Sequence, residues 1–409
     1  MTFGEVAQTR LSEISACSAP GAGVTRLPFT PEHHLALDHI RHWMTAAGLE
    51  VHMDAAATLI GRLEGPVGSK TLLIGSHQDS VPNGGRYDGI MGVLLPCLAL
   101  EMLRNDGRTL PYSVEILAFA DEEGVRFPTA LLGPRTLAGT YDSNALDLAD
   151  QDGVTLRAAL TAFGADPMQL DQLARNPADL LGYLETHIEQ GPVLETHNAP
   201  LGVVTGICGI ERNRVRFNGQ TGHAGTVPMA DRRDTLVAAS RLIAAAADTA
   251  KATNTVRATV GTISVQPNAV NAIPKTADFS LEVRSISDEA RQGFTKKMRA
   301  IGEQIARDGG LAFEMEQTYV QPAVACDTDL SETLATAIQQ AGHPVFTLPS
   351  GATHDASAMS DLCPIAMLFV RCKHGLSHRP DEEANAADMN AAIDAIAGFL
   401  VSLAATSSI

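Results

Sequence analysis

The chain has 409 residues, of which 45% are hydrophobic and 19% charged, and its formal net charge is −17. This length and composition predict a folded protein of about two or three domains and argue against a disordered chain. The negative charge argues against nucleic acid as a partner, because phosphate backbones bind to basic surfaces.

The six cysteines include no CxxC pair, which argues against a structural zinc knot. The N-terminal segment has no apolar h-region of a signal peptide, and no run of about 18 apolar residues is apparent. We therefore expect no signal peptide and no membrane span. Free thiols favour a reducing, cytoplasmic setting.

Helical and strand-like segments alternate along the first half of the chain. Periodicity predicts helices over 32–49, 92–103 and around 155–175. Pro96 in the second helix is tolerable only near the first turn. Apolar runs predict buried strands over 71–76, 112–120 and 183–189. This alternation predicts an α/β fold with a mixed, largely parallel sheet and helices on both faces.

The pattern changes near residue 210. Alternating polar and apolar residues predict half-exposed strands over 211–219, 257–265 and 277–285, with helices over 235–250 and 288–308. We expect an inserted α+β domain with an antiparallel sheet over 210–325. The α/β pattern then returns, with helices over 330–341 and 386–404 and a buried strand over 364–370. The larger domain would therefore combine residues 1–209 and 326–409.

A glycine-rich loop, GSHQDSVPNGGRYDG, follows the strand predicted over 71–76 and contains His77, Asp79 and Asp88. Buried imidazoles and carboxylates are costly unless they are paired. A metal, a catalytic role or a tight turn could each explain this loop. Its glycines would bend the chain so that Asp88 points back at His77.

Metal-capable side chains recur near the ends of four apolar runs. They are His77 with Asp88, Asp121 to Glu123, His187 with Glu189, and His378. Parallel strands would bring them to one sheet edge, and this donor set suits Zn²⁺ or Mn²⁺. Asp88 could bridge two ions through its two oxygens. Of the tandem acids Glu122 and Glu123, one could bind metal while its neighbour stays free as a base.

Each of these signals also has an ordinary structural explanation. The HxD sequence is typical of a turn or a helix cap, and DEE of a solvated charge run. A histidine in a strand can be a core residue, and His374 competes with His378. The residues alone leave the choice between a metal site and structural roles open, and only their joint pattern favours metal.

Six segments together resemble the amidase/hydantoinase/carbamoylase branch of the co-catalytic metallohydrolases, the superfamily of aminoacylase and carboxypeptidase G. They are GSHQDSVPNGGRYDG, FADEEGVRFPTALLGPRTLAG, THIEQGPVLE, GHAGTVPM, PNAVNAIP and SGATHDASAM with FVRCKHGLSHRPDE. The resemblance covers nearly the whole chain. It implies a catalytic domain that holds two divalent ions (Zn²⁺, Mn²⁺ or Co²⁺) and an inserted lid and dimerisation domain.

The resemblance also implies roles for individual residues. His77, His187 and Asp88 would hold one ion, and Glu123, His378 and the same Asp88 would hold the other. The implied catalytic residues are Glu122 as general base, Asp79 as the group that orients His77, and His223 as a lid histidine that acts across a homodimer. The implied substrate-binding residues are Gln190, Arg212, Asn271, Arg284 and Gly351.

Alternatives and departures accompany these roles. Gln190 and Asn271 could simply cap turns, and Arg284 could be an ordinary exposed strand residue. Gly222 stands before the lid histidine where the family often has Asn. Thr353 stands in the SGATHD segment where Gly is common, which puts the close approach of that backbone to substrate in doubt.

The resemblance implies hydrolysis of a carbamoyl (ureido) C–N bond in a carboxylate-bearing substrate, with release of ammonia and carbon dioxide. DEEGVRF, HAGTVPM, PLGVVTGI and LFVRCK look closest to allantoate amidohydrolases. N-carbamoyl-L-amino-acid hydrolase and β-ureidopropionase are alternatives. A metal-free binding relative would lack a ligand, whereas all five are present. An aminoacylase or dipeptidase is disfavoured because His187 stands where peptidase relatives usually have a carboxylate.

Overall fold

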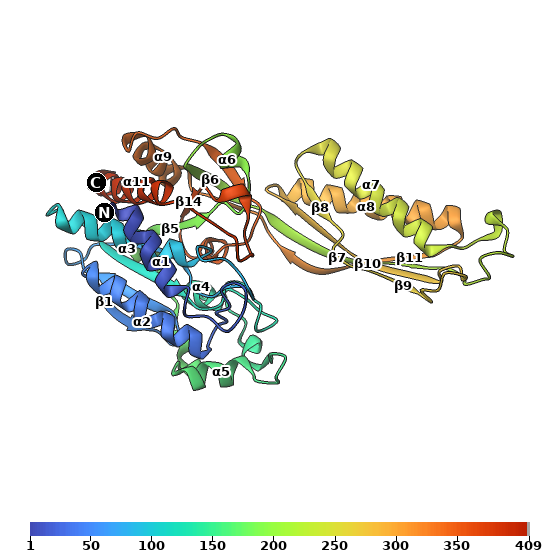
Figure 1. Ribbon diagram of the computed structural model, residues 1–409, viewed down its shortest axis with the longest axis horizontal. Coiled ribbons are helices and arrows are strands. Elements are labelled where there is room, and N and C mark those ends of the chain that lie inside the picture. Colours follow the sequence, from blue (N-terminus) through green and yellow to red (C-terminus); the bar gives the residue numbers. More distant parts are fainter. Residues whose placement is uncertain (407–409) are drawn as a thin grey trace. The chain divides into compact units, whose positions relative to one another are not determined.

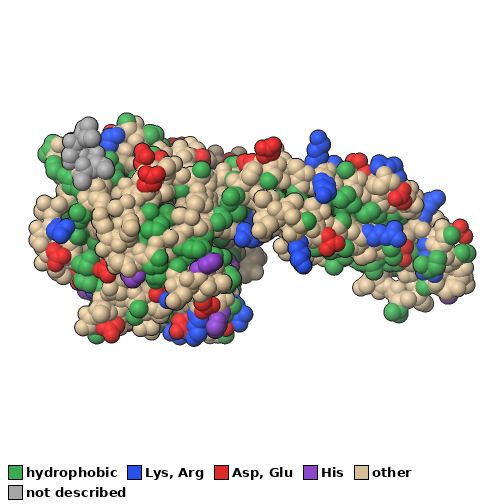
Figure 2. All heavy atoms as spheres, turned by 90° about the horizontal axis from the view of Figure 1, so that it is seen from above, with side chains coloured by type: hydrophobic (Ala, Val, Ile, Leu, Met, Phe, Trp, Pro, Cys, Tyr) green, Lys and Arg blue, Asp and Glu red, His purple; other side chains and the backbone are tan. Residues whose placement is uncertain are grey.

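The structure is a computed structural model that describes residues 1–406, and it divides into two compact units (Figure 1). Unit 1 combines Met1–Thr205 with the chain from Cys326 onward, and unit 2 is Gly206–Ala325. The junction expected at 209/210 therefore lies at 205/206, while the junction at 325/326 is the same. Acidic and basic side chains are interspersed over the face shown in Figure 2.

A mixed sheet forms the centre of unit 1. Its strands are β1 (Glu50–Met53), β2 (Leu59–Leu63), β3 (Thr71–His77), β4 (Ser113–Phe119), β5 (Leu180–Ile188), β6 (Leu201–Ile207), β12 (Val324–Ala325), β13 (Thr347–Ser350) and β14 (Ile365–Val370). Their order is β1-β2-β4-β3-β5-β14-β6-β12, with β13 paired to β6. β12 and the last two residues of β6 fall within the bounds of unit 2. The neighbours β4, β3, β5 and β14 are parallel, whereas β2 and β6 are antiparallel to the strands they flank.

Helices cover both faces of the central strands. Every residue of β3, β4 and β14 is buried, although successive residues of a strand point to opposite faces. The helices are α1 (Phe3–Ile14), α2 (Pro31–Ala46), α3 (Ile90–Asn105), α4 (Leu132–Ala138), α5 (Leu156–Phe163), α6 (Val193–Thr196), α9 (Thr328–Gln340), α10 (Asp355–Met359) and α11 (Ala386–Thr406). Short 3₁₀ turns are η1 (Ser143–Asp147), η2 (Pro167–Leu173), η3 (Pro177–Asp179) and η5 (Lys373–Gly375). The predicted fold class is confirmed.

Two expectations for unit 1 need correction. Pro96 lies in the second turn of α3, which begins at Ile90, so the helix forgoes one backbone hydrogen bond inside a buried element. The helix expected around 155–175 ends at Phe163, because Gly164 adopts φ 97° as its C-cap and only a 3₁₀ turn follows.

One helix of unit 1, α11, is long and apolar enough to cross a membrane by length and composition alone. Its residues 386–404 have a mean hydropathy of 1.4, yet 61% of this window is buried inside the structure. The helix packs against α1, α3 and α9, which accounts for its apolar sequence.

Unit 2 is an antiparallel sheet with two helices packed on one face (Figure 1). Its elements are β7 (Gly209–Asn218), η4 (Met229–Asp231), α7 (Thr235–Thr253), β8 (Arg257–Thr259), β9 (Ile263–Gln266), β10 (Thr276–Ser285), α8 (Asp288–Gly309) and β11 (Ala312–Gln321). The strand order is β11-β7-β10-β8, and β9 also pairs with β10. The single strand expected over 257–265 is therefore interrupted and forms two strands, β8 and β9. Between them, Ser280 Oγ of β10 accepts hydrogen bonds from the backbone N–H groups of Gly261 and Thr262.

Candidate metal centre

The carboxyl ends of four parallel strands meet at one edge of the unit 1 sheet and carry the predicted ligands there. His77 is the last residue of β3, and His187 is the penultimate residue of β5. Glu123 follows β4, and His378 lies in the segment after β14. The structure thus brings together side chains that are up to three hundred residues apart in the sequence.

The loop between β3 and α3 delivers Asp88 to the same edge. Gly89 closes this loop with φ 65°, a left-handed conformation that suits glycine. A Cβ at Gly89 would lie 2.3 Å from the His77 ring, so no larger residue fits unless the ring moves. The glycine therefore lets Asp88 and His77 approach each other.

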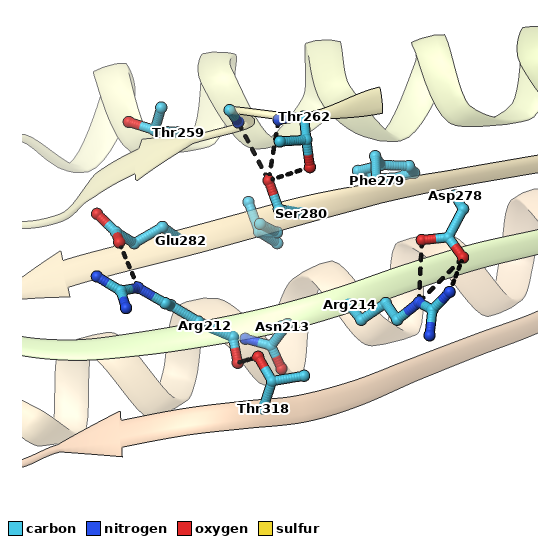
Figure 3. A pocket seen from close by; sticks show the side chains of 12 residues that line it. Arg212, Asn213, Arg214, Thr259, Thr262, Asp278, Phe279, Ser280, Glu282 and Thr318 are labelled. Atoms are coloured by element: carbon cyan, nitrogen blue, oxygen red, sulfur yellow. Dashed lines mark hydrogen bonds and ion pairs between the residues drawn. The ribbon is translucent and has the colours of Figure 1, made fainter. Parts of the chain in front are cut away.

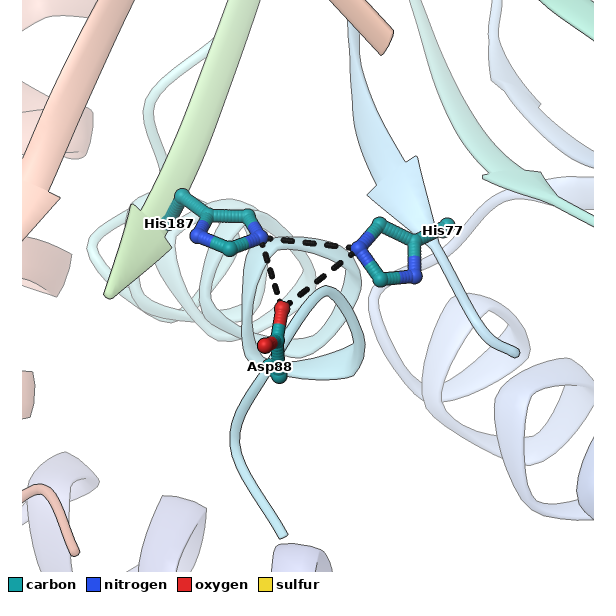
Figure 4. A group of neighbouring side chains, drawn as sticks. All are labelled: His77, Asp88 and His187. Atoms are coloured by element: carbon teal, nitrogen blue, oxygen red, sulfur yellow. Dashed lines mark hydrogen bonds and ion pairs between the residues drawn. The ribbon is translucent and has the colours of Figure 1, made fainter. Parts of the chain in front are cut away.

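His77, Asp88 and His187 form one group that could hold a metal ion (Figure 4). Asp88 Oδ1 lies 3.0 Å from His187 Nε2 and 3.6 Å from His77 Nε2, and the two nitrogens are 3.5 Å apart. Two atoms that each bind a tetrahedral Zn²⁺ at about 2.1 Å are roughly 3.4 Å apart. All three side chains are buried, and their spacing fits one ion.

Asp88, Glu123 and His378 form a second such group. Asp88 Oδ2 lies 3.4 Å from His378 Nε2, and Glu123 Oε1 lies 3.5 Å from the same nitrogen. Glu123 Oε1 is buried and accepts no hydrogen bond from the part of the chain that the structure describes. Asp88 thus presents one oxygen to each group, as a carboxylate that bridges two ions must.

The outer nitrogens of both buried histidines are fixed by the backbone. His77 Nδ1 lies 3.0 Å from the Asp79 carbonyl oxygen, and His187 Nδ1 lies 2.9 Å from that of Ile188. Each Nδ1–H therefore donates to a carbonyl, which leaves the Nε2 lone pair directed at Asp88. The Asp79 carboxylate accepts the backbone N–H groups of Glu122 and Glu123, both at 3.2 Å, so it also fixes the acidic pair.

Burial and mutual repulsion perturb the carboxylates of this centre. Burial raises the pKa of Glu122 well above its usual value, and the charges of Glu123 and Asp355 raise it further. Burial and the neighbouring Asp88 raise the pKa of Glu123 to about 7. Carboxylates that disfavour each other's charge in this way favour a bound cation. The donor set, the unpartnered oxygen of Glu123 and the spacing all fit two divalent ions.

Two further groups share residues with this centre: His77 with Glu122 and Glu123, and His187 with Glu185 and His354. Glu122 Oε2 lies 4.0 Å from His77 Nε2, beside the first group. His354 packs edge-on against His187 with ring centroids 4.6 Å apart. Its Nε2 lies 2.7 Å from Ser350 Oγ, next to Gly351. The predicted substrate loop therefore lies close to the centre.

Gln190 contacts Asp88 in this structure. Gln190 Nε2 donates to Asp88 Oδ2 at 2.9 Å and lies 3.3 Å from Ser377 Oγ. Ser377 and Glu382, which also contact Asp88, were missed by sequence reasoning. The only signal for them is that they lie in the SHRPDE segment beside His378.

The other predicted residues lie in unit 2. His223 and Asn271 belong to neighbouring segments, joined by a backbone bond from Ala224 N–H to the Asn271 carbonyl. His223 Nδ1 accepts the Gly225 N–H at 3.1 Å, so Nε2 carries the proton when the ring is neutral. A Cβ at Gly222 would approach Val227 to 3.0 Å, so the Asn often found there in the family would need Val227 to shift.

Arg212 and Arg284 share one carboxylate on the part-exposed face of the unit 2 sheet. Glu282 Oε2 lies 2.8 Å from Arg212 Nε, and Glu282 Oε1 lies 2.8 Å from Arg284 Nε. Arg212 also lies over the Tyr319 ring, 5.1 Å from its centroid. Figure 3 shows the pocket along this face, with the Arg212–Glu282 and Arg214–Asp278 pairs on neighbouring strands. Glu282 was missed, although its place two residues before Arg284 puts both on one face of β10.

Comparison with known proteins identifies the family. Residues 73–402 match the peptidase family M20/M25/M40. The N-carbamoyl-L-amino acid amidohydrolase of Geobacillus stearothermophilus is 40% identical over 93% of this chain and 94% of its own length. The allantoate deiminase of Arabidopsis thaliana is 38% identical over 97% of this chain and 82% of its own.

A solved structure agrees over the whole fold. The hydantoinase/carbamoylase family amidase from Burkholderia multivorans superimposes with a TM-score of 0.91 at 31% identity, covering 98% of each chain. The chain therefore belongs to the peptidase family M20/M25/M40 and is an amidohydrolase of its hydantoinase/carbamoylase branch.

Proposed function

We propose that this protein hydrolyses the carbamoyl C–N bond of a ureido-substituted carboxylic acid, with allantoate as the first candidate substrate. The observation that carries the proposal is the geometry of Asp88, whose two oxygens face two separate groups of ligands while Glu122 lies beside the first group. The names of the matched relatives, N-carbamoyl-L-amino acid amidohydrolase and allantoate deiminase, support the substrate class.

The proposed centre holds two divalent ions. His77, Asp88 and His187 would hold one, and Asp88, Glu123 and His378 the other. When bound, such ions acidify a water molecule and polarise the carbonyl oxygen of the substrate. Zn²⁺, Mn²⁺ and Co²⁺ all suit this mixture of imidazole and carboxylate ligands.

Glu122 would act as the general base and then the general acid. Its carboxylate takes a proton from the attacking water and passes it to the leaving nitrogen. One water and one ureido group then yield ammonia, carbon dioxide and the amine. The hydrogen bonds from the Glu122 and Glu123 N–H groups to Asp79 would hold Glu122 in place for both transfers.

Residues of unit 2 would complete the site. Its role would be that of a lid and dimerisation domain, and we propose that His223 acts on the site of a second copy in a homodimer. The Nε2–H of His223 would donate to the oxygen that gains negative charge. Arg284 would pair with the substrate carboxylate, with Arg212 beside it on the neighbouring strand, whereas Asn271 lies next to His223. Glu282 would then have to share its two arginines with the substrate.

N-carbamoyl-L-amino acids are the second candidate substrates, favoured by the 40% identity to the Geobacillus stearothermophilus enzyme. Initial rates of the metal-loaded protein with allantoate, N-carbamoyl-L-amino acids and N-acetyl-L-amino acids would separate the possibilities. Ammonia release reports the first two reactions, and amine release the third. We expect the highest kcat/KM with allantoate. Faster cleavage of N-acetyl substrates than of either ureido acid would contradict the proposed function.

A further inference from the structure

Glu382 is a buried carboxylate that holds the loop carrying Asp88. It lies in the segment after β14 and is 4% exposed. Its Oε1 accepts hydrogen bonds from the backbone N–H groups of Tyr87, at 2.9 Å, and Asp88, at 3.0 Å. A Cβ at Gly85 would lie 2.1 Å from the Glu382 carboxyl carbon, so only glycine fits beside it. This carboxylate therefore fixes the backbone from which Asp88 projects.

Ser377 links the second oxygen of Glu382 to the side chain of Asp88. Ser377 Oγ lies 2.9 Å from Glu382 Oε2 and 2.6 Å from Asp88 Oδ2. Ser377 directly precedes His378, whose φ of 58° is a conformation that non-glycine residues adopt only where their surroundings hold it. Glu382 thus reaches both Asp88 and the backbone that presents His378.

We propose that Glu382 is a positioning residue of the metal centre, which sets the geometry of Asp88 and His378 without binding an ion itself. Its Oε1 accepts two backbone N–H groups, and its Oε2 lies within hydrogen-bond distance of Ser377 Oγ, whose single proton Glu382 and Asp88 share. The inference rests on the proposed metal centre. We expect Glu382 to support chiefly the ion held by Asp88, Glu123 and His378, because Glu382 positions two of these three ligands, Asp88 and His378.

Removing such a support weakens metal binding without removing a ligand. Groups that orient metal ligands are typically worth about 10- to 100-fold in metal affinity. We expect Glu382→Ala to lower the affinity for one of the two ions by about that factor. Glu382→Gln should lose less, because its amide oxygen can still accept the N–H groups of Tyr87 and Asp88.

The test is a metal titration of the full-length protein. The parent and the variants are stripped with a chelator and titrated with Zn²⁺ against a competing chromophoric chelator, and Co²⁺ spectra are then recorded. Glu382→Ala should bind its second ion about 10- to 100-fold more weakly and shift the visible Co²⁺ bands, which report ligand geometry. Glu383→Gln is the matched control, because its side chain is half exposed and pairs only with Lys373 among the contacts described.

Three outcomes would decide between the explanations. A folded Glu382→Ala variant that binds both ions as tightly as the parent, with unchanged Co²⁺ bands, would overturn the inference alone. A parent that binds no metal would overturn the proposed function and this inference with it. If Glu382→Ala does not fold, Glu382→Gln and Ser377→Ala decide, and parental affinity and spectra in both would overturn the inference.

Discussion

Asp88 presents its two carboxylate oxygens to different partners. Oδ1 faces His77 and His187, whereas Oδ2 faces His378 and accepts from Gln190 and Ser377. A carboxylate suits this place, because binding both ions requires two ligand oxygens on one carbon and a full negative charge. The centre therefore depends on this residue more than on any single histidine.

Replacing Asp88 tests this dependence. Asp88→Asn keeps the size of the side chain but removes its charge and turns one oxygen into an N–H donor. We expect at least one ion to be lost and kcat/KM for ureido acids to fall by at least about 100-fold, because bridging and water activation both need the charge. Metal content after dialysis and initial rates measure the two effects. A folded variant with two equivalents of metal and the parental rate would contradict the shared-carboxylate centre.

Replacing Glu122 gives a second prediction, because the loss of a general base and the loss of a metal ligand have different effects. Glu122→Gln should leave the metal content unchanged and lower kcat by about 10²- to 10⁴-fold, the usual contribution of a positioned proton carrier. The matched variant is Glu123→Gln, next in the chain, which should instead lose metal. If Glu122→Gln lost an ion and Glu123→Gln did not, the two roles would have to be exchanged.

The metal ligands could be predicted from the sequence more readily than the residues that position them. His77, Asp88, Glu123, His187 and His378 follow apolar runs, and parallel strands must bring the ends of such runs to one edge. Ser377 and Glu382 have no comparable signal, because each acts through a partner on another segment of the chain. Glu282 did have one, because its spacing of two from Arg284 places both side chains on one face of β10.

Individual elements were predictable where local signals and packing agree. The strand after residue 70 and the helix after residue 287 appear almost as expected, as β3 and α8. The helix expected around 155–175 failed because Gly164 ends α5. α1 was missed, although Thr2 and Glu5 form a capping box at its start, a signal that the sequence does contain. β11 was missed, although its residues partly alternate.

The turn between β1 and β2 predicts a pH-dependent stability. Asp54 Oδ1 accepts the backbone N–H groups of Ala56 and Thr58, both at 2.9 Å, whereas Oδ2 is buried without a hydrogen-bond partner among residues 1–406. Burial raises the pKa of Asp54 to about 6. A carboxyl group with a raised pKa favours the fold below about pH 4, and this stability is lost as the pH rises through about 6.

Asp54→Asn should therefore gain stability relative to the parent as the pH rises from 4 to 7. The amide keeps the Oδ1 acceptor but never ionises, so the difference in free energy of unfolding should move by about 2 kcal/mol in favour of the variant. Denaturant unfolding at several pH values, with chelator present throughout, measures it. Asp152→Asn, at an exposed turn position, is the control. If the difference in free energy of unfolding stayed constant between pH 4 and 7, the ionisation of Asp54 would not destabilise the fold, and the prediction would be wrong.

At the scale of the whole molecule, the metal ligands come from both chain segments of unit 1, on either side of unit 2. His77, Asp88, Glu123 and His187 precede the insertion, and His378 follows it. Unit 2 has its own apolar core between its sheet and α7 and α8. It can therefore serve as a separate structural module, in keeping with its proposed role in dimerisation and with the proposed action of His223 on another subunit.

Subunit mixing tests whether His223 acts across the dimer. Glu122→Gln and His223→Ala should each be nearly inactive alone. In a heterodimer of the two, the subunit with an intact Glu122 receives His223 from its partner, and that one site is complete. Random pairing makes about half of the dimers mixed, each with one working site of two, so co-expressed variants should recover about a quarter of the parental activity. Both variants must first be shown to be dimeric and metal-loaded. If His223 served its own subunit, every site in the mixture would lack one of the two residues, and the activity would stay at the level of the separate variants.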